Sequence, residues 1–361
     1  MNRNRTRFEI KRPVKIFFFL VSLFSLAGII AFYALLTPLP SEAEPLIFYA
    51  TPKRDDLKLT LLRAIRKAQH SIWICSYGIS DKEVLAMLKK KAAAGVRVDL
   101  VYHHSINRQL HRQERANFHC HPKKNKGLMH EKLLITDDTL LFFGSTNLTS
   151  SSLLMHDNCL LGLYAPGLAS SLKYERLSHY QQRLNKQQLD LFILPQGGGQ
   201  ALKKLLETLD QAKHRVSIAL FTLTHPALVD KLIALHQRGI QIQLFLDQYT
   251  ARAASKKAVA KLRAAQIPVS ISQGLALFHH KWALVDSDTL ILGSANWTRK
   301  AFKKNNELLL FLTPLSKAHA RSFSRAIKTF KLETTLARIS HKTPGNLGSS
   351  VSPNIPKDSP G

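Results

Sequence analysis

A polar motif occurs twice in this chain, and its two copies start at His130 and His279, 149 positions apart. The first copy reads HEKLLITDDTLLFFGSTNLT (130–149) and the second reads HHKWALVDSDTLILGSANWT (279–298). Eight of the 20 aligned positions are identical: His, Lys, Asp, Leu, Gly, Ser, Asn and Thr. A doubled motif at fixed spacing indicates a chain built from two similar halves, rather than one surface hairpin that carries a histidine.

The sequence upstream of each copy predicts the same order of secondary structure. Residues 71–104 and 217–249 both open with an apolar β-rich run, continue with a helical period, and enter a second strand after a glycine. Strand–helix–strand units imply parallel strands with right-handed crossovers. Further helical patterns occupy 56–70, 200–214 and 317–339. The chain is therefore predicted to be α/β, with a first half at 46–194 and a second at 200–338.

The N-terminus predicts a membrane anchor. Residues 1–15 form a basic segment, and residues 16–36 contain no charged side chain over a length that spans a bilayer as a helix. The basic flank predicts a cytoplasmic N-terminus and an exported catalytic domain on the periplasmic or extracellular side. A cleaved signal ending near SEA (41–43) is the less favoured alternative. Residues 340–361 are rich in Pro, Gly and Ser and are predicted to be a disordered tail.

The charge balance predicts an anionic partner. The chain has 52 basic and 24 acidic residues, a formal net charge of +28. Residues 1–40 hold only six of those bases and one of the acids, so the exported part keeps +23. Such an excess favours nucleic acid, an anionic membrane or a phosphorylated substrate over a merely soluble cationic surface.

The cysteines carry little functional signal. Cys75 and Cys159 lie in apolar runs and are expected to be core residues. An exported domain permits one disulfide among Cys75, Cys120 and Cys159, but the sequence does not select the pair. His119, Cys120 and His121 lie close together, yet no second cluster completes a zinc site, so loop residues are the favoured interpretation.

Each motif copy gathers polar groups at one end of a predicted hairpin. His130 and Lys132 lie two apart on a strand, so both side chains project from the same face. Asp137 falls in the turn, Gly144 and Ser145 end the return strand, and Asn147 follows. The second copy repeats this order with His279, Lys281, Asp286, Gly293, Ser294 and Asn296. These groups are suited to holding a phosphate and attacking it.

Two copies of HxKxxxxDxxxxxxGSxN resemble the phospholipase D superfamily, over roughly residues 46–335. The resemblance implies two pseudo-symmetric halves, with mixed sheets flanked by helices, whose motifs meet at one site. One histidine would form a phosphohistidine, and the other would protonate the leaving alcohol and then activate water, without a metal or another cofactor. The implied catalytic residues are His130, Lys132, Asn147, His279, Lys281 and Asn296, and the implied supporting residues are Asp137, Ser145, Asn158, Asp286, Ser294 and Glu307.

The resemblance also bears on which histidine is the nucleophile. The family places a carboxylate behind each histidine, and the positions 28 residues after His130 and His279 are Asn158 and Glu307. If each half supports its own histidine, Glu307 favours the protonated form of His279, which suits a general acid. His130 is then the nucleophile, in line with the family's tendency. If the halves exchange supports, this reasoning reverses and only that tendency is left.

The substrate stays open at this stage. The membrane segment favours a phospholipase D that acts, as a monomeric catalytic unit, on anionic or zwitterionic phospholipid and releases phosphatidic acid and a headgroup alcohol. The alternatives are an exported nuclease acting on nucleic acid, because residues 293–310 resemble small bacterial nucleases of the superfamily, and a phosphatidyl transferase. The Asp-x-Arg-Ser usual in cardiolipin synthases follows neither motif, which argues against that branch. A non-catalytic anion-binding module is least favoured, because both motifs are complete.

Overall fold

The computed structural model describes residues 21–22, 25, 28, 37–124 and 127–340, with side chains as far as residue 334. The described residues from Pro40 onward form one compact unit. The predicted basic segment (1–15), transmembrane anchor (16–36) and tail (340–361) lie outside the described residues, apart from a few single positions. Within the described part, no helix combines the length and the apolar character needed to cross a bilayer.

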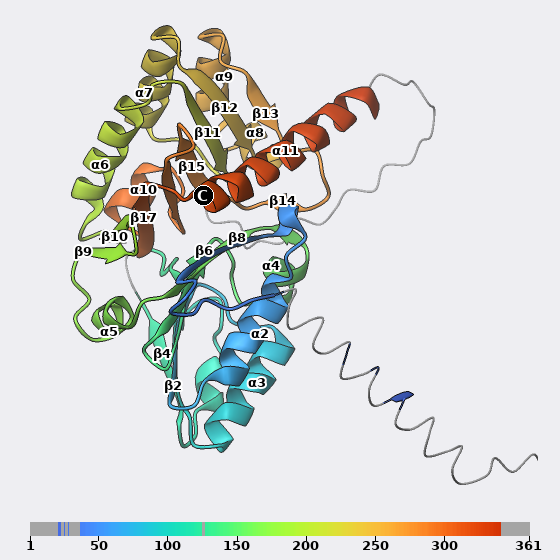
Figure 1. The fold of residues 1–361 in the computed structure, drawn as a ribbon, viewed down its shortest axis with the longest axis vertical. Helices are drawn as coiled ribbons and strands as arrows, with labels where there is room; N and C mark the ends of the chain where they lie inside the picture. The colour runs from blue at the N-terminus through green and yellow to red at the C-terminus, as the bar shows by residue number, and fades with distance from the viewer. Residues whose placement is uncertain (1–20, 23–24, 26–27, 29–36, 125–126, 341–361) are drawn as a thin grey trace, which may run out of the picture. The chain divides into compact units, whose positions relative to one another are not determined.

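Two mixed sheets form the frame of the larger unit (Figure 1). The first contains, in spatial order, β1 (Leu46–Ala50), β8 (Cys159–Tyr164), β6 (Leu140–Gly144), β5 (Lys132–Thr136), β2 (Ser71–Ser76), β3 (Arg97–His103) and β4 (Phe118–Lys123). The second contains β13 (Val269–Ile271), β12 (Gln241–Leu246), β11 (Arg215–Leu220), β15 (Lys281–Val285), β16 (Thr289–Gly293), β17 (Glu307–Thr313), β10 (Gln187–Leu194) and β9 (His179–Leu184). A short ribbon pairs β7 (His156–Asp157) with β14 (Leu277–Phe278).

The strand directions follow the repeat. In each sheet the strands of the predicted strand–helix–strand unit are parallel, β2 with β3 and β11 with β12. The two strands of each motif hairpin are antiparallel, β5 with β6 and β15 with β16. The predicted α/β architecture of two similar halves with mixed sheets is confirmed.

Helices flank both sheets, and Figure 1 shows α2 and α3 beside the first sheet and α6, α7 and α9 beside the second. They are η1 (Thr51–Lys53), α2 (Leu57–Lys67), α3 (Lys82–Ala93), η2 (Leu110–Gln113), α4 (Ser150–Leu154), α5 (Pro166–Tyr174), α6 (Gly198–Asp210), α7 (Pro226–Gln237), α8 (Gln248–Arg252), α9 (Lys256–Ala264), α10 (Arg299–Lys303) and α11 (Lys317–Ser340). Asp81 caps α3 by accepting from the N–H groups of Glu83 and Val84. Gly95 follows α3 with a φ of +89°, which an L side chain rarely adopts.

Helix α11 ties the two halves together. The ring of Phe323 stacks on Phe48 of β1, with centroids 3.9 Å apart, and packs edge-on against Trp282 of β15 at 5.3 Å. Phe330 of the same helix lies 4.8 Å from Phe278. Because these rings are almost fully buried, the helix closes a core shared by both sheets.

One sequence expectation changes in the structure. Strands β9 and β10 pair into the second sheet through β17, so the predicted boundary at 194–200 lies too late in the chain. Sequence periodicity could not reveal this, because β10 reads as a buried strand that fits either half. Cys75, Cys120 and Cys159 are free, buried thiols, so the described residues contain no disulfide.

Candidate active site

The two halves exchange the residues that support their histidines. His130 of the first half places Nδ1 2.8 Å from Oε2 and 3.0 Å from Oε1 of Glu307, which belongs to the second half. His279 of the second half places Nδ1 3.1 Å from Oδ1 of Asn158 and 3.0 Å from the carbonyl oxygen of Ser145, both in the first half. Of the two alternatives that the sequence leaves open, the structure therefore shows exchanged supports.

The crossing is a consequence of how the hairpins end. Asn158 directly precedes β8 and Glu307 begins β17, and each of these strands pairs with the return strand of its own motif. With Nδ1 engaged by an acceptor in each case, Nε2 is the nitrogen that each imidazole can offer to a substrate.

The motif serines hold these supports in place. Ser145 Oγ donates to Asn158 Oδ1 over 2.7 Å, and Ser294 Oγ donates to a carboxylate oxygen of Glu307 over 2.6 Å. Each hydroxyl also accepts the backbone N–H that follows the support, from Cys159 and from Leu308, at 3.0 Å. Ser145 and Ser294 thus orient the side chains of Asn158 and Glu307, which in turn contact the histidines.

The motif glycines are required by close strand contact. A Cβ added at Gly144 would lie 2.3 Å from the carbonyl oxygen of Cys159, and one added at Gly293 would lie 2.0 Å from that of Leu308. Both contacts are with rigid backbone. The Gly-Ser pair therefore lets the return strand approach its neighbour closely enough for the serine to reach Asn158 or Glu307.

Each motif lysine is held under its histidine. Lys132 Nζ donates to the carbonyl oxygen of His130 over 2.7 Å, and Lys281 Nζ donates to that of His279 over 2.9 Å. Lys132 lies 5.9 Å from the ring centroid of Tyr77, and Lys281 lies 5.0 Å from that of Phe221. Tyr77 and Phe221 also contact the histidine rings edge-on. Cation–π contact keeps both ammonium groups oriented.

The four basic side chains are buried and share one environment. Burial lowers the pKa of His130 to about 4, against the opposing effect of Glu307, and lowers the pKa of Lys132 to about 7. Burial, and then Lys281 and Lys132, hold the pKa of His279 well below its ordinary range. The pKa of Lys281 is lowered in the same way, by burial and then by Lys132. Groups from both halves therefore meet at one place.

That place contains little compensating negative charge. Among the described residues, Glu307 is the one carboxylate that hydrogen-bonds to any of the four basic groups. Asn147 Oδ1 and Asn296 Oδ1 are buried, and neither has a hydrogen-bond partner among the described residues. Buried basic groups with little negative charge nearby are the setting in which a bound oxyanion is stabilised.

The motif aspartates lie away from this place. Asp137 accepts the backbone N–H groups of Gln69, His70 and Ser71, at the far end of β5 from His130. Asp286 does the same for Lys213, His214 and Arg215. The two carboxylates thus secure the helix-to-strand junction that precedes β2 or β11. Thr149 and Thr298, also identical in both copies, cap α4 and α10.

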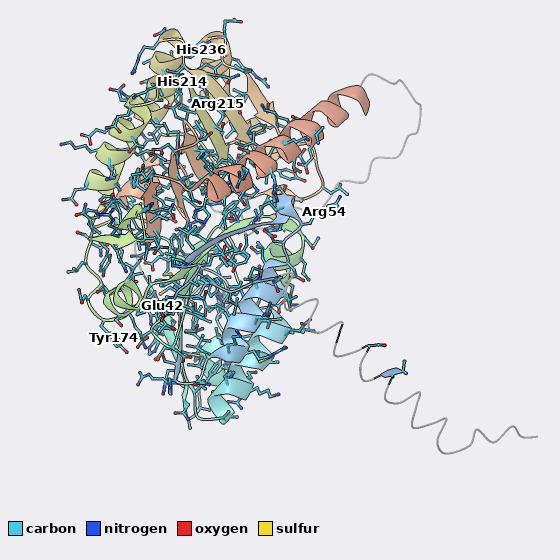
Figure 2. All side chains as sticks on the ribbon, in the orientation of Figure 1. Glu42, Arg54, Tyr174, His214, Arg215 and His236 are labelled. Carbon is cyan, nitrogen blue, oxygen red and sulfur yellow. The ribbon has the colours of Figure 1, made fainter. Side chains whose placement is uncertain are left out.

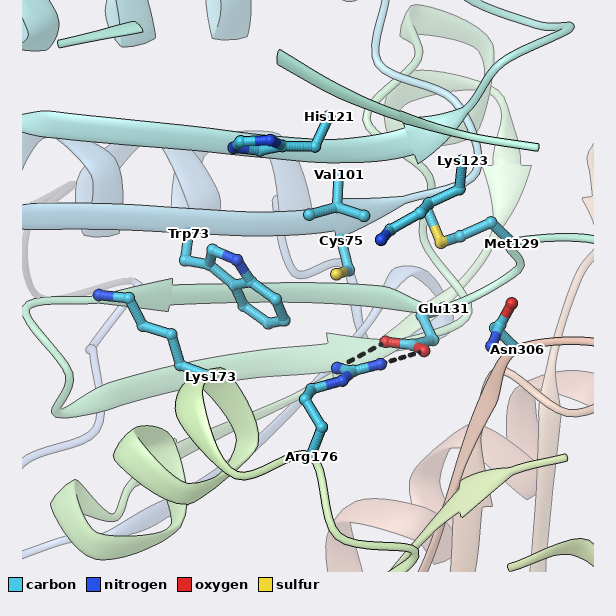
Figure 3. A pocket seen from close by; sticks show the side chains of 10 residues that line it. All are labelled: Trp73, Cys75, Val101, His121, Lys123, Met129, Glu131, Lys173, Arg176 and Asn306. Carbon is cyan, nitrogen blue, oxygen red and sulfur yellow. Dashed lines mark hydrogen bonds and ion pairs between the residues drawn. The ribbon is translucent and has the colours of Figure 1, made fainter. Parts of the chain in front are cut away.

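An ion pair next to the first motif does not show in the sequence. Glu131, between His130 and Lys132, is 1% exposed and accepts from Arg176 at 2.8 and 3.3 Å. Figure 3 shows this pair at one end of a cavity of about 410 Å³ that also contains Trp73 and Lys123. No local pattern relates Glu131 to a residue 45 positions later, so only the fold reveals the pair.

Two further histidines lie close to the motif residues. His280 is fully buried among Phe278, Trp282 and Phe330, where it packs as a core residue. His103 ends β3, and its Nδ1 accepts the N–H of Met129 over 3.4 Å, just before His130. The equivalent contact in the second half is made by Asp247, which accepts from Phe278.

Comparison with known sequences points to one family. The family model described as "Cardiolipin synthase, PLD-like domain" matches residues 61–179 and 205–328, more than half of the chain. The mitochondrial cardiolipin hydrolase of Xenopus laevis is 34% identical over 128 residues, which cover 35% of this chain and 60% of that protein. A phospholipase D of Rickettsia bellii is 24% identical over 138 residues, 38% of this chain and 67% of that protein. The chain spans about half of the length of most of the curated cardiolipin hydrolases that it matches.

Comparison of folds extends over more of the chain. The crystal structure of phosphatidylserine synthase from Haemophilus influenzae superposes with a TM-score of 0.64 at 13% identity. The superposition covers 86% of this chain and 97% of that one, so both halves share that fold.

Proposed function

The chain belongs to the phospholipase D superfamily, and from that premise we propose that it is a phosphodiesterase that hydrolyses phospholipid through a phosphohistidine. The observation that carries the proposal is the meeting of His130, Lys132, His279 and Lys281 in one buried place with a single carboxylate. A phosphodiester supplies the missing negative charge, and its presence would favour the protonated forms that burial disfavours.

His130 is the proposed nucleophile. Its Nε2 attacks phosphorus, the bond from phosphorus to the headgroup oxygen breaks, and the imidazole becomes positively charged. Glu307 at Nδ1 stabilises that charge as it develops. With the supports exchanged, the pKa argument alone would favour His130 as the acid, so the assignment of the attack to His130 follows the family's tendency and this stabilisation of the covalent cation. Lys132 and Lys281 neutralise the phosphoryl oxygens.

His279 is the proposed general acid. It donates the proton on Nε2 to the departing alcohol, then takes a proton from the water that attacks phosphorus and releases phosphatidic acid. Its neutral partners, Asn158 and the Ser145 carbonyl, do not stabilise the cation as a carboxylate would. An imidazolium without that stabilisation gives up its proton more readily, which suits this role.

We favour phospholipid over nucleic acid as the substrate. The uncharged segment at 16–36 supports an enzyme that is anchored in a membrane and exported. The names of the cardiolipin hydrolase and phospholipase D relatives are in keeping with a lipid substrate. A nuclease is the second candidate, because a net charge of +23 outside residues 1–40 would also hold a phosphate backbone.

The test offers full-length protein in mixed micelles both phosphatidylglycerol and DNA, with EDTA present. We expect headgroup release that is lost in His130→Ala and His279→Ala and kept in His214→Ala. His214 is an exposed histidine, which Figure 2 places in the second half. Cleavage of DNA without headgroup release would refute the lipase, and loss of all activity in EDTA would refute the metal-free mechanism.

A further inference from the structure

An exposed apolar surface adjoins the ribbon that carries His279. Leu154, Met155, Tyr249 and Leu275 are 64%, 68%, 54% and 103% exposed. We call these four side chains the apolar rim. They make up half of the eight large apolar side chains that are exposed in the described residues. Scattered single apolar residues are ordinary at a protein surface, but a group on neighbouring segments marks an interaction site.

The backbone brings these segments together. Strand β7 pairs in parallel with β14, with Leu277 opposite His156. Leu154 and Met155 directly precede β7, and Leu275 lies two residues before β14. The loop that carries Leu275 is bound to the start of α8, because the side-chain amide of Gln248 donates to the Gly274 carbonyl over 3.0 Å. Tyr249 is the next residue of α8.

The same ribbon leads directly to the candidate active site. His279 follows β14, and its backbone N–H donates to the Asp157 carbonyl of β7 over 2.8 Å. Its ring lies edge-on to His156, with centroids 6.0 Å apart. Asn158, which supports His279, follows β7. The apolar rim therefore borders the side of the site from which the proposed general acid acts.

Two exposed arginines lie beside the rim. Arg54 directly follows η1, whose Thr51 hydroxyl donates to the Asp157 carboxylate over 2.7 Å. Arg252 is the last residue of α8. Figure 2 shows Arg54 on the side of the molecule where β14 lies. Aliphatic and tyrosine side chains flanked by arginines are suited to the boundary between headgroups and acyl chains of an anionic bilayer. A nucleic-acid surface would instead combine cations with stacked rings.

We propose that the apolar rim inserts into the interfacial layer of an anionic phospholipid bilayer and presents the phosphodiester to the His279 side of the site. This inference rests on the proposed lipid substrate and assigns the surface through which that substrate is reached. It gives a role to side chains that otherwise expose large apolar areas to water at no benefit to folding.

Insertion is tested on the full chain, without relying on turnover. Leu275→Cys, in an inactive His130→Ala background, is labelled with an environment-sensitive fluorophore and reconstituted into vesicles of phosphatidylcholine and phosphatidylglycerol. The native cysteines are buried, so the new thiol takes the label. We expect a blue-shifted emission that is quenched by lipids spin-labelled near the headgroup.

The matched control is Leu177→Cys. Leu177 is also exposed and lies just beyond α5, whose Tyr174 Figure 2 shows on the opposite side of the molecule from Arg54. Its label is expected to show neither change. Equal quenching at both positions would overturn the proposal. So would a label at Leu275 that responds to single-stranded DNA and not to vesicles.

Activity separates this proposal from the proposed function. The double variant Leu154→Ser/Leu275→Ser is expected to release headgroup from vesicles about tenfold more slowly. It should hydrolyse a short-chain, monomeric phospholipid at the wild-type rate, and Leu177→Ser should match the wild type on both substrates. An equal loss of rate on both substrates would overturn the proposed role of the apolar rim. Absence of lipid hydrolysis in the wild type would overturn the proposed function instead, whereas the fluorescence result would still decide the rim.

Discussion

Glu307 accepts a hydrogen bond from Nδ1 of His130 across the boundary between the two halves, with 2.8 Å between His130 Nδ1 and Glu307 Oε2. Neither half alone therefore contains a complete histidine dyad. The pKa of Glu307 is lowered because the effects of His130, Lys132 and Ser294 outweigh burial, which raises it. The carboxylate is thus ionised beside the imidazole that it orients.

Replacement of this carboxylate should affect chemistry more than binding. Glu307→Gln keeps the size of the side chain but removes the charge that stabilises the His130 cation, so we expect kcat to fall about a thousandfold with little change in KM. Steady-state kinetics on phospholipid micelles measures both. Glu207→Gln, an exposed change on α6, serves as the matched control. A wild-type kcat in Glu307→Gln would contradict the assigned role.

The neutral partner of His279 offers a test of its role by pH. Asn158→Asp places a carboxylate at Nδ1 of His279 and should raise the pKa of that imidazole. If His279 must be protonated to act, activity is lost as pH rises through its pKa. The alkaline limb of the kcat/KM profile should then move to higher pH. A shift of the acidic limb instead would indicate that His279 acts in its neutral form, as a nucleophile does.

The motif aspartates should matter for stability and not for catalysis. Asp286→Asn weakens three backbone hydrogen bonds, and we expect a loss of about 2 kcal/mol in the free energy of unfolding with kcat unchanged. Asparagine tolerates the φ of +49° at this position. Urea unfolding in micelles measures the change, with Asp288→Asn in the same turn as control.

The same aspartate should shape the acid limb of stability. Burial raises the pKa of Asp286, but the hydrogen bonds from the N–H groups of Arg215, Lys213 and His214 lower it by more than burial raises it. The net shift of the pKa is therefore downward. Its stabilisation is therefore complete above the unfolded pKa of about 3.9 and is lost as pH falls through the folded value. A stability difference between wild type and Asp286→Asn that persists below that range would contradict this explanation.

His280 should make the protein sensitive to acid. Burial, and then Lys281, lowers its pKa to about 3, and neither ring nitrogen has a partner among the described residues. The unfolded chain binds a proton near pH 6.5 and the folded chain does not, so stability falls as pH drops from 7 toward 4. His280→Leu should lose about 3 kcal/mol less over that range. Identical pH dependence in the wild type, His280→Leu and the exposed control His214→Leu would contradict this.

Much of the fold follows from local patterns in the sequence. The apolar periods at 56–70 and 317–339 become α2 and α11, and the apolar runs on both sides of Asp137 become β5 and β6. These features depend on residues a few positions apart, which sequence periodicity records. The doubled motif identifies the two histidines and two lysines that lie together, because repetition at constant spacing reports on pseudo-symmetry.

The pairing between halves could not be predicted in the same way. His130 meets Glu307, 177 positions away, because the strand starts at Asn158 and Glu307 each face the opposite sheet. Spacing within one copy is equally compatible with support inside a half. The motif aspartates were grouped with the site because they recur with it, yet recurrence also marks structural residues that hold the same junction twice.

Trapping the covalent intermediate tests the central claim most directly. Full-length His279→Asn and His130→Asn are mixed with phospholipid, quenched in base after milliseconds, and digested for mass spectrometry. The mechanism predicts a phosphatidyl group on His130 in His279→Asn, where the base that activates water to hydrolyse the adduct is absent, and no adduct in His130→Asn. An adduct on His279 in His130→Asn, with none on His130 in the other variant, would contradict it.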